Sequence, residues 1–75
     1  MTAYTLDETA EKVGAKIKQL RIDAGYTSYE NFAVTFSLDR KQYWRMEKGA
    51  NIRLATLLEI VNIHKLTLEE FFKGL

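Results

Sequence analysis

The sequence predicts an all-α fold: one compact domain of five short helices over residues 1–75. Proline is absent and only four glycines occur, so few residues interrupt helical segments. Apolar residues recur at three- and four-residue steps, the spacing of a helix with one buried face. Residues that cap helix N-termini precede most of these runs. With 47% hydrophobic residues in 75, the chain has enough apolar side chains for one small core.

The first helix is expected from about Leu6 to Ala24. Thr5 and Glu8 have the spacing of a capping box, in which each side chain accepts a hydrogen bond from the other residue's backbone. Gly25 supplies the left-handed conformation that commonly ends a helix. The expected buried stripe comprises Ala10, Val13, Ile17, Leu20 and Ala24.

A second, shorter helix is expected from about Ser28 to Phe36. Thr27 and Glu30 have capping-box spacing, which places the start of the helix directly after Thr27. Phe32, Ala33 and Phe36 share one face of this helix and are expected to be buried.

The third helix is expected from Arg40 to Lys48, after a tight turn. Asp39 is a favourable N-cap, and Gln42 holds the reciprocal position of the box. Gly49 is expected to end the helix.

Two further helices complete the expected fold. The fourth runs from about Arg53 to Ile63 and is expected to bury a stripe of Leu54, Leu57, Leu58 and Val61. The fifth follows Thr67, whose partner Glu70 completes another capping box. It carries Leu68, Phe71 and Phe72 and stops near Gly74, with Phe71 expected in the core.

The charge of the chain is unevenly distributed, although its net value is only +1. Five of the eleven Lys and Arg residues lie between positions 40 and 53, namely Arg40, Lys41, Arg45, Lys48 and Arg53. Glu47 is the one acid in that stretch, whereas the segments on either side are slightly acidic. This distribution is typical of a surface that binds a polyanion.

The third helix separates its cations from its apolar residues. At about 100° per residue, Arg40, Trp44, Lys48, Lys41 and Arg45 fall within an arc of roughly 140°. Tyr43 and Met46 point the other way and are expected to reach the core. Taken alone, such a basic face is often only solvated, and Trp44 could either project outward or fold back over the helix pair.

The apolar residues of the second and third helices also have the spacing of a helix-turn-helix core. These residues are Phe32, Ala33, Phe36, Leu38, Tyr43 and Met46. Together with IKQLR (17–21), Gly25, MEKG (46–49) and LTLEEFF (66–72), they resemble the lambda-repressor-like family of the Cro/cI or xenobiotic-response-element type. The resemblance extends over roughly residues 12–72 and implies a helix-turn-helix at about residues 28–48.

The chain departs from the family pattern at a few positions. Ser37 and Lys65 stand where glycine is usual, and His64 stands where leucine is common. One extra residue lies in the YTSYEN segment, between Gly25 and Phe32, so the family pattern does not specify the residue at which the second helix begins. None of these departures removes a core position.

The resemblance implies a sequence-specific regulator of transcription, of phage or bacterial type, that binds double-stranded DNA. Its recognition helix would be Arg40–Lys48, placed in the major groove as a repressor of this family places it. The expected base-reading residues are Arg40, Lys41, Gln42, Trp44 and Arg45, although Gln42 could instead be used by the cap. The expected phosphate contacts are Ser28, Tyr29, Lys48 and Arg53.

The resemblance also implies a structural ion pair and a dimer. Arg21 and Glu47 match a family pair that forms an internal salt bridge, which would assign Glu47 to the scaffold. Members of the family usually dimerise, and the C-terminal helix is the expected surface, with Phe72 and Leu75 exposed in the monomer.

Other functions are expected to be absent or secondary. The Asp and Glu residues form no obvious acid–base pair, and the single histidine has no second metal ligand at helical spacing, so we expect neither an enzyme, a metal site nor a cofactor. The chain has no cysteine, no signal-like N-terminus and no long apolar run, which favours a cytoplasmic protein without a membrane span. The alternative function is a protein-interaction or antitoxin-type module with the same fold, bound to a protein partner.

Overall fold

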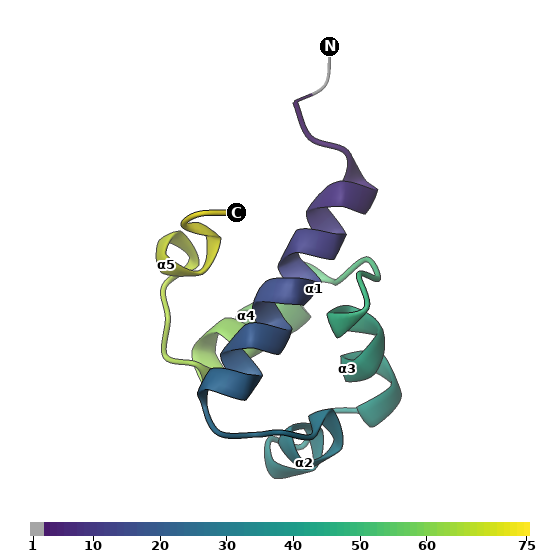
Figure 1. Ribbon diagram of the computed structural model, residues 1–75, viewed down its shortest axis with the longest axis vertical. Coiled ribbons are helices and arrows are strands. Elements are labelled where there is room, and N and C mark those ends of the chain that lie inside the picture. The colour runs from purple at the N-terminus through teal and green to yellow at the C-terminus, as the bar shows by residue number, and fades with distance from the viewer. Residues whose placement is uncertain (1–2) are drawn as a thin grey trace.

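The computed structural model describes residues 3–75, which form five α-helices and no β-strand. The helices are α1 (Leu6–Asp23), α2 (Tyr29–Thr35), α3 (Arg40–Glu47), α4 (Leu54–Ile63) and α5 (Leu68–Phe72). The long helix α1 runs along the molecule, α2 lies at one end, and α3 and α5 lie on opposite sides of α1 (Figure 1). The predicted all-helical architecture of five helices is confirmed.

Three helices begin at the capping residue that the sequence predicts. The Glu8 N–H donates to Thr5 Oγ1 over 3.2 Å, and the Gln42 N–H donates to Asp39 Oδ1 over 2.9 Å. At Thr67 the complete capping box forms, because the Glu70 carboxylate also accepts from the Thr67 N–H. The reciprocal half of the box forms only before α5.

The start of α2 differs from the prediction. Ser28, not Thr27, is the N-cap, and its Oγ accepts from the N–H groups of Glu30 and Asn31 over 3.1 and 3.3 Å. Two adjacent hydroxyl residues both satisfy the general capping preference, so the sequence alone did not select between them. The remaining helix ends agree to within one residue, with Ala24, Lys48 and Arg53 as cap residues just outside their helices.

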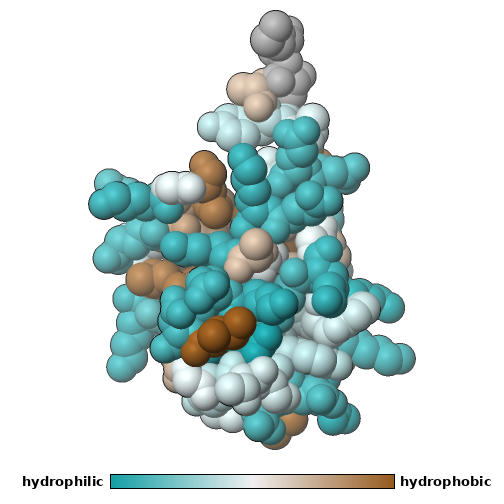
Figure 2. Space-filling view, in the orientation of Figure 1, coloured by the Kyte–Doolittle hydropathy of each residue, from teal (hydrophilic) through white to brown (hydrophobic). Residues whose placement is uncertain are grey.

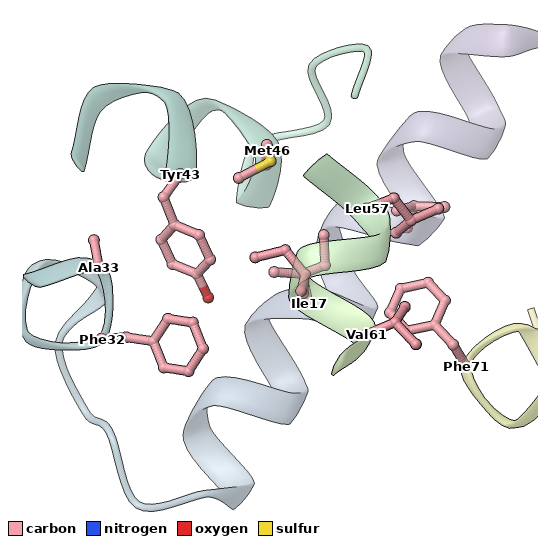
Figure 3. Packing of buried hydrophobic residues seen from close by; sticks show 10 residues of the cluster. Ile17, Phe32, Ala33, Tyr43, Met46, Leu57, Val61 and Phe71 are labelled. Atoms are coloured by element: carbon pink, nitrogen blue, oxygen red, sulfur yellow. The ribbon is translucent and has the colours of Figure 1, made fainter. Parts of the chain in front are cut away.

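Each helix contributes one large side chain that is fully buried at the centre. These residues are Ile17, Phe32, Tyr43, Ile60 and Phe71. Figure 3 shows Tyr43 of α3 directed toward Phe32 of α2, with Ile17 of α1 beside them. The rings of Phe32 and Tyr43 stack with their centroids 5.1 Å apart. Burying such rings provides much of the apolar contact that joins the helices.

The buried stripes predicted for the first and fourth helices are partly wrong. Ala24 is exposed because it caps the end of α1, beyond the last turn that packs. Leu54 and Leu58 are 68% and 39% exposed, and α4 instead buries Leu57, Ile60 and Val61. Since α4 is apolar on most of its circumference, three- and four-residue spacing fits more than one face, and tertiary packing selects between them.

Two turns hold a non-glycine residue in the left-handed region. Ser37 and Lys65 both have φ of 57°. Each is followed by a backbone hydrogen bond that closes the end of a helix, from Leu38 N–H to Ala33 O over 2.8 Å and from Leu66 N–H to Val61 O over 3.1 Å. These bonds stabilise a backbone conformation that side chains disfavour.

The single histidine packs into the aromatic core. The His64 ring stacks on Phe32, with centroids 5.3 Å apart and planes within 11°. Its Nε2 atom is buried and has no hydrogen-bond partner among residues 3–75. Burial disfavours the charged ring and lowers the pKa of His64 below its usual 6.5.

We therefore expect the domain to lose stability as the pH falls below about 6.5. The unfolded chain takes up a proton at His64 in that range, whereas the folded domain resists it until the lower folded pKa is reached. The free energy of unfolding should fall by at most about 1.4 kcal/mol per pH unit in this window. Urea unfolding of the wild type and His64→Leu at several pH values checks this, because an unchanged slope in the variant would assign the effect to other groups.

Candidate nucleic-acid interface

One face of α3 is attached to the rest of the domain. Tyr43 is fully buried and Met46 is 6% exposed, and both belong to the central hydrophobic cluster. The helix packs chiefly on α1 and α2. Burial of Tyr43 raises the pKa of its hydroxyl, so the ring stays neutral in the core. The orientation of α3 is therefore set by its inner face.

A buried ion pair fixes the C-terminal end of α3 to α1. Arg21 Nε donates to Glu47 Oε2 over 2.8 Å, and a second guanidinium nitrogen donates to Oε1 over 3.2 Å. The remaining terminal nitrogen donates to the carbonyl of Tyr26 over 2.8 Å. The two side chains are only 6% and 5% exposed, and the bond to Glu47 raises the pKa of Arg21. The pair expected from the family resemblance is confirmed, and Glu47 belongs to the scaffold.

Gly14 permits the close approach of α1 to the end of α3. A Cβ atom at position 14 would collide with the carbonyl oxygen of Met46, and it would lie 3.0 Å from that of Glu47 and 3.1 Å from the Gly49 nitrogen. All three are backbone atoms, which cannot turn aside as a side chain does. The only local signal of this role is a glycine inside an otherwise helical segment.

The opposite face of α3 carries the candidate base-reading residues. Arg40, Lys41, Gln42, Trp44 and Arg45 are all exposed. Within residues 3–75 the only salt bridge is that between Arg21 and Glu47, so no cation of this face is paired directly with an acid of the described chain. The face offers many N–H donors and positive charge, which suit a polyanion with acceptor groups.

Gln42 keeps its side chain free for contacts. Asp39 caps the helix by accepting from the backbone N–H of Gln42, and no hydrogen bond of the Gln42 side chain occurs among the described residues. The expected alternative, in which the Gln42 amide is used by the cap, is not the observed arrangement. The amide lines a hollow of about 280 Å³ beside Arg45 and Arg53, between α3 and the start of α4.

Trp44 projects outward and does not fold back into the core. Its side chain is 43% exposed and lies outside the hydrophobic cluster. The ammonium of Lys48, one turn further along, lies 5.6 Å from the centre of the indole ring. Trp44 also lines an open hollow of about 480 Å³ with Tyr29, Glu30, Arg40, Lys41 and Arg45.

The four candidate phosphate contacts lie around this face in different environments. Lys48 and Arg53 are exposed, whereas Ser28 and Tyr29 are half-buried at the start of α2. The Ser28 Oγ already accepts two backbone hydrogen bonds as the helix cap, so only its hydroxyl proton is available for a further contact. Tyr29 packs against the core and also borders the hollow beside Trp44.

The described residues offer no metal cluster. No group of three His, Cys, Asp or Glu side chains in residues 3–75 is arranged to hold a metal ion. Among the same residues, no helix is long and apolar enough to cross a membrane.

Comparisons with known proteins provide no family for the chain. No protein-family model, no curated protein and no solved structure matches it.

Proposed function

We propose that this protein is a sequence-specific regulator of transcription that binds double-stranded DNA through a lambda-repressor-like helix-turn-helix. In this proposal α2 and α3 form the helix-turn-helix, and α3 is the recognition helix that enters the major groove. Arg40, Lys41, Gln42, Trp44 and Arg45 read base edges, and the residues around them contact the phosphates.

One observation carries the proposal: α3 is fixed by its inner face, and the cations on its outer face form no salt bridge within residues 3–75. Arg40, Lys41, Arg45 and Lys48 are all exposed, and none forms a salt bridge within residues 3–75. An eight-residue helix is about 12 Å long, which is comparable to the width of the major groove. Bidentate donors such as Arg match the two acceptors of guanine, and Gln matches adenine.

Selection of binding sites from a pool of randomised duplexes tests the proposal. We expect enrichment of a defined site, and binding that weakens steeply as the salt concentration rises because phosphate contacts release counterions. Trp44 is the single tryptophan, so its fluorescence should change when a selected duplex binds. Absence of any enriched sequence, or a salt-independent affinity, would contradict the proposal.

Some residues of the outer face should discriminate between base pairs, and others should add affinity for any duplex. We expect Arg45→Ala to relax discrimination at one base pair by about 1–3 kcal/mol, with Arg40→Ala acting similarly at another. Lys48→Ala should weaken all duplexes to a similar degree and reduce the slope of log affinity against log salt by about one. Titration of single-base variants of the selected site checks both, and a loss confined to one base pair in Lys48→Ala would refute the assignment.

The proposal includes a homodimer, because one small module buries too little surface for tight operator binding. Phe72 and Leu75 are 41% and 38% exposed, and both border a hollow of about 240 Å³ beside the start of α1. Figure 2 shows separate apolar spots in the region of α5, with hydrophilic side chains between them. A second copy pairing through this surface would place two recognition helices on half-sites about 34–36 Å apart.

We expect Phe72→Glu to prevent dimerisation and to weaken binding to a duplex with two half-sites by roughly 100-fold or more, through loss of bivalency. Affinity for a single half-site should be unchanged. Leu58→Glu is the matched control, since Leu58 is an apolar residue of similar exposure on α4. Sedimentation velocity and duplex titration measure the two effects, and equal behaviour of both variants would reject the α5 surface.

A protein-interaction or antitoxin-type module is the second candidate function. The unexpected exposure of Leu54 and Leu58 on α4 favours it, because exposed leucines on one helix suit a protein partner. Salt-insensitive association with a protein and no enrichment of any duplex would support this alternative over the regulator.

A further inference from the structure

We infer that Trp44 makes the site selective for a methyl group at C5 of a pyrimidine, supplied either by thymine or by 5-methylcytosine. The inference rests on the proposed DNA-binding function and deepens it. It concerns which chemical group the exposed indole recognises within the groove.

The chemistry of the indole restricts what it can read. Its ring nitrogen is a donor only, so Trp44 cannot form the donor–acceptor pair that recognises adenine or the double donor pair that recognises guanine. Its large flat surface favours an apolar contact instead. In the major groove, the pyrimidine C5-methyl is the apolar group that a base edge presents.

The position of Trp44 on α3 places the ring among the base-reading residues. On a helical wheel Trp44 lies about 40° from Arg40 and 60° from Lys41, inside the cationic arc. These two side chains and Arg45 line the same hollow as the indole.

A neighbouring cation lies over the indole of Trp44. The ammonium of Lys48 lies 5.6 Å from the ring centre and covers one of its faces. The side chain remains 43% exposed, so a substantial apolar surface is available for burial. Burying a methyl group against this surface is favourable, and no polar group of the partner needs to be satisfied there.

The test uses the duplex that the wild-type protein selects from a randomised pool. Each thymine is replaced singly by deoxyuridine, which removes the C5-methyl and leaves the hydrogen-bonding groups intact. In a second arm each cytosine is replaced by 5-methylcytosine. We expect at least one position at which the methyl group strengthens wild-type binding about three- to fivefold, the effect of burying one methyl. An effect at a thymine position identifies thymine as the source of the methyl group, and an effect at a cytosine position identifies 5-methylcytosine.

The methyl effect should disappear in Trp44→Ala and persist in Ile22→Ala. Ile22 is the matched control because its side chain is 44% exposed but lies on α1. Circular dichroism of both variants confirms that they are folded, and Trp44→Gln provides a second test if the alanine variant is not. A methyl effect of equal size in Trp44→Ala would overturn the inference.

Two other outcomes separate this inference from the proposed function. A selected duplex that shows no methyl-dependent position, although Trp44→Ala binds it more weakly, overturns the inference and assigns the ring to the sugar–phosphate wall. Failure to select any duplex overturns the proposed function itself and the inference with it.

Discussion

Glu47→Ala is expected to destabilise the domain by about 3–5 kcal/mol, because it leaves the buried Arg21 charge without its carboxylate. Glu47 accepts two hydrogen bonds from that guanidinium, at 2.8 and 3.2 Å. A chain of 75 residues has a total stability of about 4–11 kcal/mol, so this loss is a large fraction of it. Urea unfolding followed by circular dichroism measures the change.

The control for this prediction replaces both partners together. The double variant Arg21→Met, Glu47→Leu removes the pair without leaving a buried charge, and its stability should lie well above that of Glu47→Ala. The double variant should nevertheless bind duplex DNA less tightly, because the bonds that orient the end of α3 are gone. A double variant as unstable as Glu47→Ala would show that apolar packing around the pair, and not the unpaired charge, dominates the loss.

Gly14→Ala is expected to destabilise the domain by about 1–3 kcal/mol, despite the higher helix propensity of alanine. The new Cβ would collide with the Met46 carbonyl and crowd the backbone of Glu47 and Gly49. Because backbone must shift to relieve the contact, the C-terminal end of α3 should move and duplex affinity should fall as well. Thermal unfolding and duplex titration of the same variant report the two effects.

The reverse substitution at the next position, Ala15→Gly, provides the control. Ala15 is exposed on α1, immediately after Gly14, so glycine there should cost about 1 kcal/mol through helix propensity alone. Duplex binding should be unaffected. The domain should thus be more stable with alanine than with glycine at position 15, and less stable with alanine than with glycine at position 14. A stabilising Gly14→Ala would rule out the close approach of the two helices.

Local signals were sufficient for most of the fold. Helix starts followed from side chains that satisfy free backbone N–H groups, as at Asp39 and Thr67, because capping depends on neighbours within three residues. The same rule failed at Thr27, where the next residue caps equally well. On α4, burial of Ile60 instead of Leu54 depended on which neighbours the helix meets, and local spacing does not encode that.

The residues of the candidate site could be predicted from the sequence, but the packing that positions them could not. The cationic arc of α3 followed from helical periodicity, since the outer residues repeat every three to four positions. The outward position of Trp44 was open at the sequence level, because an aromatic ring is compatible with either face. Gly14 was missed because its role depends on backbone atoms more than thirty positions away in the chain.

Buried and solvent-exposed residues alternate along α3, so the exposed residues can be substituted without changing the buried ones. Tyr43, Met46 and Glu47 are in the interior, while Trp44 and Arg45, directly beside them in sequence, face solvent. Exposed substitutions away from special features usually change stability by less than about 0.5 kcal/mol. New side chains can therefore be placed on this face at little cost to folding, so the outer surface of the domain can be redesigned without altering its core.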